Sequence, residues 1–182
     1  LPQRRSHVDL LLSLESHSPG PLRLTRLTWE LRLDVRNAGG FPPSEISWFR
    51  NGWQSWSFAG MVSAANVSFP APRLPFAYGI KEDPSVPRNE SAQTSDMVTA
   101  IKLGENAMAV GAIRQQFFQR IFIDPAPPHV HLSLSIDLDG EPLPVGRSLV
   151  LGGWQFEGAR TATPLVRHWG ERNACRTAHA PL

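Results

Sequence analysis

The sequence predicts an all-β protein, an antiparallel sandwich followed by a short C-terminal helix. Three observations support this: most segments alternate apolar and polar residues with a period of two, the apolar runs are short, and Pro and Gly separate them. With 182 residues, 41% of them hydrophobic and 19% charged, the chain has the composition of one folded domain. Seven or more short strands between turns favour a sandwich over a βαβ fold.

The clearest strands are expected at residues 27–35 and 130–138. Apolar residues occupy every second position of both segments, with Thr, Ser, His and charged residues between them, so each strand should bury one face. Around Thr25 and Arg26 the pattern slips by one residue, which predicts a β-bulge. Asp139-Gly140 predicts a turn at the end of the second strand.

Further strands are expected at residues 8–14, 97–103, 107–113 and 117–123, the middle two forming a hairpin through residues 104–106. The proline-rich stretch 69–88 is predicted to form loops, because proline lacks the donor that a strand ladder needs. Thr163-Pro164 predicts a helix start, with the threonine as N-cap. We therefore expect a sandwich over residues 1–160 and a linker helix with a tail over residues 161–182.

The densest chemical signal lies between residues 48 and 57. Trp48, Phe49, Trp53 and Trp56 fall within nine positions, interleaved with amides and hydroxyls, after an expected strand and an Asn-Gly turn. Aromatic rings stack on the C–H face of a pyranose, and amides and hydroxyls bind its hydroxyl groups. This mixture predicts sugar binding, while the alternative that these tryptophans are sandwich core remains open.

Asn51, Gly52, Trp53, Gln54, Ser55 and Trp56 resemble the N-x-W-Q-S-W motif of the amino-terminal domain of family 36 glycoside hydrolases, the α-galactosidases or melibiases. The segment 93–96, with Ser95-Asp96 before an apolar hairpin, resembles that family's serine-aspartate segment. The helix at Thr163-Pro164 stands where the family links its sandwich to a catalytic barrel. In order and spacing the resemblance covers nearly the whole chain.

The resemblance implies a twisted supersandwich whose loop leans over the mouth of a catalytic (β/α)8 barrel that lies beyond residue 182. It implies that Trp56 approaches the galactose subsite, with Trp53 packed beneath it and Gln54 and Asn51 as further substrate-binding candidates. The partners would be α-galactosides together with that barrel. Both catalytic aspartates of the family belong to the barrel, so this chain alone should hydrolyse nothing.

Other carboxylates and histidines of the chain have simpler interpretations than catalysis or metal binding. Glu82-Asp83 lies in an expected loop, and Asp137 and Asp139 lie at a strand end, so we interpret these carboxylates as solvated rather than as a catalytic dyad. His129 and His131 have a chelating spacing without an evident third ligand, and the other histidines look isolated. No metal site, phosphate loop or cofactor is predicted.

The charge distribution, the length of the apolar runs and the single cysteine indicate which partners and which compartment to expect. Sixteen arginines are scattered rather than clustered and the net charge is +2, so nucleic acid is not an expected partner. No run approaches the ~20 apolar residues of a membrane helix, so no membrane partner is expected. The single cysteine is compatible with a reducing compartment and slightly favours the cytoplasm. A homo-oligomer is compatible with the sequence.

Two alternatives compete with an accessory domain of an α-galactosidase. The first is a free-standing carbohydrate-binding module, which the aromatic-rich loop alone would support. The second is an aldose mutarotase-like enzyme, because that fold is also a large sandwich; it requires a His and a Glu that converge in a cleft, and the periodicity shows no sign of such a pair.

Overall fold

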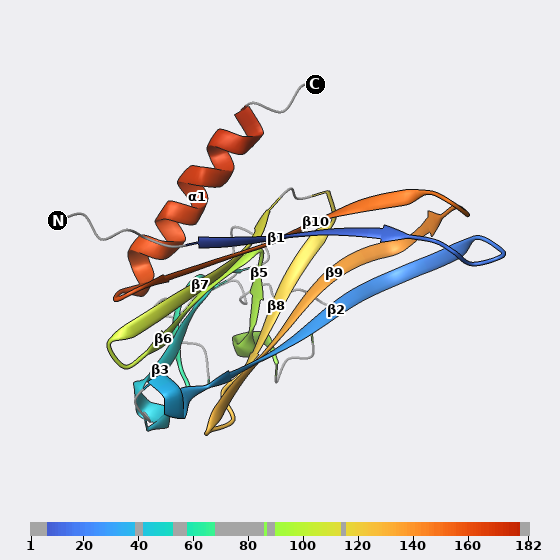
Figure 1. Ribbon diagram of the computed structural model, residues 1–182. Helices are drawn as coiled ribbons and strands as arrows, with labels where there is room; N and C mark the ends of the chain where they lie inside the picture. The colour runs from blue at the N-terminus through green and yellow to red at the C-terminus, as the bar shows by residue number, and fades with distance from the viewer. Residues whose placement is uncertain are drawn as a thin grey trace, which may run out of the picture.

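The computed structural model describes residues 7–38, 42–52, 58–67, 86, 90–113 and 116–178, and shows the predicted all-β sandwich of two antiparallel sheets with one C-terminal helix (Figure 1). The strands of the six-stranded sheet A are, in spatial order, β1 (His7–Glu15), β10 (Ser148–Ala159), β7 (Asn106–Ile113), β6 (Val98–Leu103), β3 (Ile46–Arg50) and β4 (Gly60–Ser63). Those of the four-stranded sheet B are β2 (Leu22–Asp34), β9 (His129–Leu143), β8 (Phe118–Asp124) and β5 (Thr94–Asp96). The described residues also form 3-10 turns at Val35–Ala38, Pro43–Glu45 and Ser91–Gln93.

The core lies between the two sheets, on the faces that the alternation predicts. From Val130 to Leu138 the apolar positions of β9 point inward and are at most 2% exposed, while His129, His131 and Ser133 lie on the other face and are half-buried. β2 pairs with β9 over most of its length and turns Leu27, Trp29, Leu31 and Leu33 toward the same core. Burial of one face of each sheet is what holds the two layers together.

The predicted bulge near Thr25 is present, and it corrects the prediction at Asp139-Gly140. The β2–β9 register shifts between Leu24, which pairs with Glu141, and Arg26, which pairs with Asp137. Asp139 and Gly140 both have positive φ, at 49° and 75°, and they supply the extra residues on β9. These two residues therefore form the bulge within one continuous strand rather than a turn, because the left-handed conformation bends a strand without ending it.

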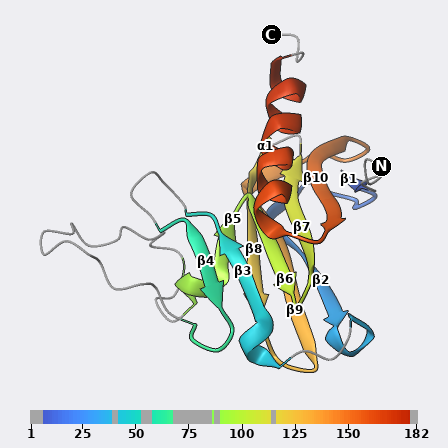
Figure 2. The same cartoon turned by 90° about the vertical axis from the view of Figure 1, so that its left-hand side faces the viewer.

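Helix α1 (Ala162–Ala178) begins one residue before the predicted N-cap, so that Thr163 and Pro164 both lie in its first turn, where a missing N–H costs no hydrogen bond. It packs on the outer face of sheet A, against β6, β7 and β10 (Figure 2). Trp169 lies directly on Gly111, and its indole N–H donates to the carbonyl of Ala112 at 3.0 Å. No helix in the described part of the chain combines the length and apolar character that crossing a membrane would need.

Candidate functional site

Of the four predicted sugar-binding residues, the structure describes one. Trp53, Gln54 and Trp56 lie outside the described residues, and so does the predicted loop 69–88 apart from residue 86, while Asn51 is described. Trp48 has 0% exposure and donates its indole N–H to the carbonyl of Ala92 at 3.1 Å, so this member of the aromatic cluster belongs to the core. The other described tryptophans, Trp29, Trp154 and Trp169, also pack within the sandwich or under α1.

A buried arginine joins the two ends of the tryptophan loop, by which we mean residues 51–58. Arg50 is the last residue of β3 and is only 2% exposed. Its Nε donates to the carbonyl of Thr94 at 3.0 Å, and its Nη1 donates to the carbonyl of Phe58. Because a buried guanidinium must have its donors satisfied, this arrangement fixes the base of the loop to β5 and holds its two ends together.

Asn51 adds a second attachment, and it does so to the other segment that carries the family resemblance. The backbone N–H of Asn51 donates to Ser95 Oγ at 2.8 Å, and its side-chain Nδ2 donates to the carbonyl of Asp96 at 2.7 Å. The backbone N–H of Asp96 returns a bond to the carbonyl of Asn51 at 3.0 Å. Two segments 44 residues apart in the chain are thus joined at the root of the tryptophan loop.

Met97 makes the corner between the two sheets at this same place. It follows β5 of sheet B, precedes β6 of sheet A, and has a φ of 65°, which is unusual for a residue other than glycine. Its N–H donates to Gln119 on sheet B at 3.0 Å, and its carbonyl accepts from Ala112 on sheet A at 2.7 Å. Backbone bonds to both sheets stabilise this strained corner, which also positions Asp96.

From Asp96 a chain of ion pairs crosses the outer face of sheet B. Arg120 Nε lies 3.4 Å from Asp96 Oδ1, and Arg120 Nη1 lies 3.7 Å from Asp137 Oδ2. Arg26 Nε binds the other oxygen of Asp137. The guanidinium of Arg120 also lies 5.2 Å from the centre of the Phe118 ring, within cation–π range. Charges therefore alternate from the loop root to the middle of β2.

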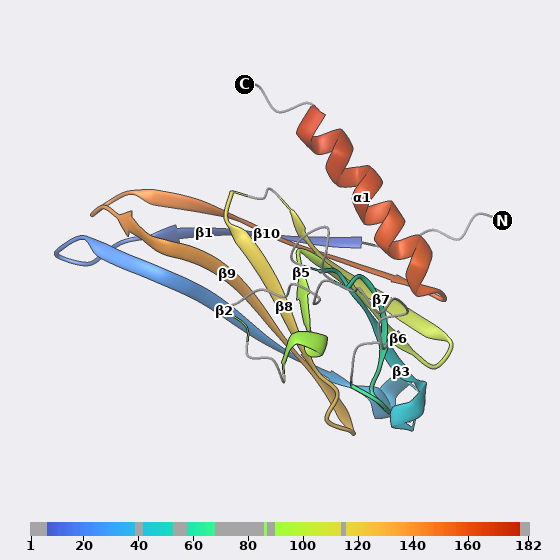
Figure 3. The same ribbon diagram turned by 180° about the vertical axis from the view of Figure 1, so that it is seen from behind.

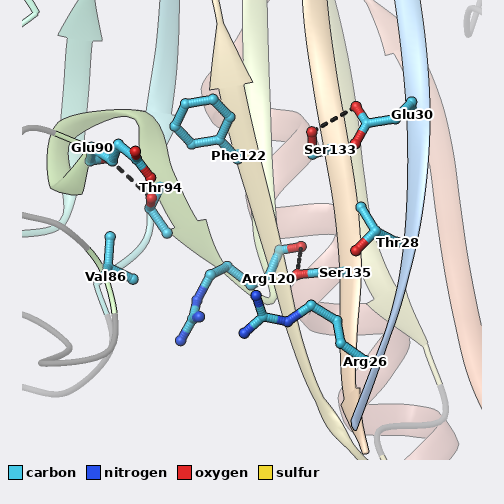
Figure 4. Close-up of a pocket in the computed structure, with 10 residues that line it drawn as sticks. All are labelled: Arg26, Thr28, Glu30, Val86, Glu90, Thr94, Arg120, Phe122, Ser133 and Ser135. Carbon is cyan, nitrogen blue, oxygen red and sulfur yellow. Dashed lines mark hydrogen bonds between the residues drawn. The ribbon is translucent and has the colours of Figure 1, made fainter. Parts of the chain in front are cut away.

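Beside these ion pairs a cavity of about 220 Å³ opens on the outer face of sheet B (Figure 4). Figure 4 shows Arg26 and Arg120 extending to the same side, below Ser135, with Glu30 bonded to Ser133 above them. Its lining residues carry hydroxyl, carboxylate and guanidinium groups and one aromatic ring. The lining residues are Arg26, Thr28, Glu30, Val86, Glu90, Thr94, Arg120, Phe122, Ser133 and Ser135.

The charges of this pocket restrict what it can bind. Among the described residues, the guanidiniums of Arg26 and Arg120 formally balance the carboxylates of Glu30 and Glu90, and Asp96 and Asp137 next to Arg120 add two negative charges. An excess of negative charge disfavours phosphate and carboxylate ligands, because like charges repel in a partly desolvated site. The mixture of donors and acceptors instead suits a neutral ligand with several hydroxyl groups.

Sequence reasoning missed this pocket and treated Asp137 as a solvated carboxylate. Asp137 is paired with two arginines, and its side chain is 17% exposed, so that interpretation is wrong. The signal was present in the polar positions of the predicted strands, where Arg26, Thr28 and Glu30 alternate opposite Ser133, Ser135 and Asp137. From the sequence alone such a face is indistinguishable from ordinary polar surface, because the pocket also needs residues of the neighbouring strands β8 and β5.

One histidine departs from expectation. His168, which looked isolated, places Nδ1 2.9 Å from Glu157 Oε1, so a histidine and a glutamate do meet. They meet under α1, where Glu157 has a side-chain exposure of 1% and also binds Arg172, so no substrate can reach the carboxylate. His129 and His131 lie in edge contact, 6.0 Å between ring centres, and the described residues contain no group of three metal-ligating side chains.

Comparison with known proteins identified neither a matching family model nor a matching curated protein.

Proposed function

We propose that this chain is the non-catalytic amino-terminal domain of an α-galactosidase-type glycoside hydrolase, which hydrolyses terminal α-galactosyl residues. In this proposal the tryptophan loop walls the sugar pocket of a separate catalytic barrel. Trp56 contacts the galactose ring, and Trp53 packs beneath it. The chain itself supplies neither the nucleophile nor the acid, which a retaining glycosidase needs as two carboxylates ~5 to 5.5 Å apart.

The observation that carries the proposal is the attachment at the loop root. Asn51, the first residue of the tryptophan motif, is hydrogen-bonded to both Ser95 and Asp96, the segment that carries the rest of the resemblance. Arg50 closes the base of the same loop from the buried side. A loop that must place an aromatic ring on a substrate benefits from a rigid base, because pre-ordering lowers the entropic cost of binding.

The test uses the full coding sequence, expressed and assayed with an α-galactoside. Trp56→Ala should lower kcat/KM by about 10- to 100-fold, which corresponds to loss of roughly 1.4 to 2.8 kcal/mol of apolar contact in the transition state. Trp56→Phe should restore part of this, and Val145→Ala, an exposed change in the turn between β9 and β10, should change nothing. Unchanged kinetics for Trp56→Ala, or a full-length protein that ignores α-galactosides, would contradict the proposal.

A free-standing carbohydrate-binding module is the second candidate, and the pocket of sheet B is the observation that favours it. Titration of this chain alone with galactose and raffinose separates the two. Millimolar or tighter binding, measured by calorimetry, supports a module, whereas no detectable binding supports a domain that completes its site against a barrel. A mutarotase-like activity is not proposed, because the His168–Glu157 pair lies beneath α1.

A further inference from the structure

β1 is an edge strand without the usual protection against pairing. It is the terminal strand of sheet A, and within the described residues it pairs with β10 alone (Figure 3). Natural edge strands are commonly short, or carry Lys or Pro, or contain a bulge. β1 has nine residues without Lys, Arg or Pro, and exposes Val8 by 64%, Leu11 by 51% and Leu10 by 40%.

The irregularity in the β1–β10 pair leaves β1 itself regular. Leu12 pairs with Gly152 and Ser13 with Val150, so the extra residue, Leu151, belongs to β10. The side chains of β1 therefore alternate without interruption from His7 to Glu15. No other described strand lies along its outward edge, and the open edge of a regular strand is a template for another strand.

The other three edges of the sandwich are protected. β4 and β5 have four and three residues, too few for a long ladder. β2 is long, but it carries Arg23, Arg26 and Arg32 along its outer face. Only β1, among the edges that the structure describes, is long, regular and apolar, so a partner for this edge is expected.

We propose that β1 pairs in antiparallel fashion with β1 of a second copy of this chain, about a twofold axis at Leu11. In that register Leu10 opposes Leu12 and Val8 opposes Leu14, so each of these apolar residues faces another. His7 opposes Glu15 at both ends of the ladder, and Asp9 opposes Ser13. The register thus pairs apolar residues with apolar residues and each carboxylate with a polar side chain, as an isologous interface of the strand with itself requires.

Other registers of the β1–β1 pair oppose less compatible residues. A twofold axis perpendicular to the sheet keeps both strands' faces aligned, so a residue can oppose only residues of its own face. Centring the pair on Leu12 would place Asp9 against Glu15, two carboxylates in direct opposition. Centring it on Leu10 would place Asp9 against Leu11 and leave Glu15 without His7. The register about Leu11 alone matches both the apolar and the charged positions.

This surface is independent of the proposed function, because β1 lies outside both the tryptophan loop and the pocket of sheet B. It assigns a geometry to the homo-oligomer that the sequence merely permits. A single strand ladder buries less than a standard interface, so we expect an association on the order of micromolar rather than an obligate dimer.

The first experiment measures the mass of the 182-residue chain by sedimentation equilibrium over a concentration series around that value. The wild-type chain should shift from monomer to dimer. Leu11→Lys puts two like charges on the twofold axis and should weaken the dimer by about tenfold or more. Val145→Lys, which adds the same charge at another exposed valine, should leave the dimer intact. A monomer throughout, or a dimer equally strong in Leu11→Lys, overturns the proposal.

The second experiment tests the register in a Cys175→Ser background, with a short thiol-specific crosslinker. Leu11→Cys places the two thiols opposite each other and should give covalent dimers, whereas Asp9→Cys places them four positions apart, roughly 13 Å along the ladder, and should not. Glu15→Lys alone should weaken association, and the charge swap His7→Glu with Glu15→Lys should restore it. Efficient linking through Asp9→Cys, or no rescue by the swap, would show that the register is wrong.

Discussion

The two outer faces of the sandwich each carry a cluster of charged side chains. A helix covers one cluster, and the other is open to solvent. On sheet A, α1 lies over Glu157, whose side chain is 1% exposed and binds His168 and Arg172. On sheet B, Asp137 binds two arginines in a similar way, but Arg26 is 52% exposed and the cluster borders an open pocket. A covered cluster can only hold the fold together, whereas an uncovered one can also meet a ligand.

Burial also decides how strongly each cluster should resist mutation. Removing one member of a buried ion pair leaves its partner charged and desolvated, which commonly costs about 3 to 5 kcal/mol. Exposed pairs contribute about 0 to 1 kcal/mol, because water and salt replace the lost partner. The two faces should therefore respond very differently to similar substitutions.

The largest effect is expected from Glu157→Gln. Arg172 would lose its carboxylate under α1, where the side-chain amide of Gln155 is a further polar neighbour. We expect the free energy of unfolding, measured by urea denaturation, to fall by about 3 to 4 kcal/mol. Glu171→Gln removes the same charge from an exposed i,i+4 pair with Arg167 and should cost less than about 0.5 kcal/mol. Equal losses would show that the cover does not matter.

The next effect is expected on sheet B, from Arg120→Met. Arg120 is 10% exposed and contacts both Asp96 and Asp137, although at 3.4 and 3.7 Å these pairs are longer than ideal. We expect a loss of about 2 to 3 kcal/mol in the same assay. Arg26→Met, which removes the exposed partner of Asp137, should cost less than about 1 kcal/mol. If Arg26→Met cost more stability than Arg120→Met, the exposed pair of Arg26 with Asp137 would contribute more to the fold than the buried contacts of Arg120.

A smaller effect is expected where α1 meets sheet A. A Cβ on Gly111 would overlap the indole of Trp169, so Gly111→Ala must displace the helix that covers Glu157. We expect a loss of about 1 to 2 kcal/mol in urea denaturation. Gly158→Ala, on the adjacent strand β10, meets nothing within 4 Å and should be close to neutral. A neutral Gly111→Ala would mean that α1 adjusts without strain.

The strands could be predicted because their pattern is local. β2 and β9 have a period of two over long stretches, the slip at Thr25 marked a real bulge, and the hairpin of β6 and β7 was expected through residues 104–106. Asp139-Gly140 was misread because left-handed residues serve turns and bulges alike. Which of the two forms depends on the partner strand, and a local pattern does not contain that information.

The candidate site could be predicted only in part, for the same reason. The tryptophan motif and Ser95-Asp96 were both singled out by resemblance, but their hydrogen bonds through Asn51 are contacts between distant segments. The sequence places Arg50 at a polar strand end, yet the residue is buried and donates to the carbonyls of Thr94 and Phe58. The pairing of His168 with Glu157 depends on where α1 lies on the sheet, so no periodicity could reveal it.

The smallest effect should appear at the end of β2, where neither helix nor pocket covers the charge. Arg36 donates from its side chain and its backbone to Asp34, and chiefly the side-chain bond lowers the pKa of Asp34 from 3.8 to about 2. Because the pKa is depressed in the folded state, the pair stabilises the protein above pH 3.8, and this contribution is lost as the pH falls through about 2. An NMR titration of the Asp34 carboxyl should therefore show a low midpoint that returns toward 3.8 in Arg36→Gln. A midpoint near 3.8 in the wild-type protein would mean that solvent screens even this bidentate pair, and the contrast between covered and uncovered charges would be sharper still.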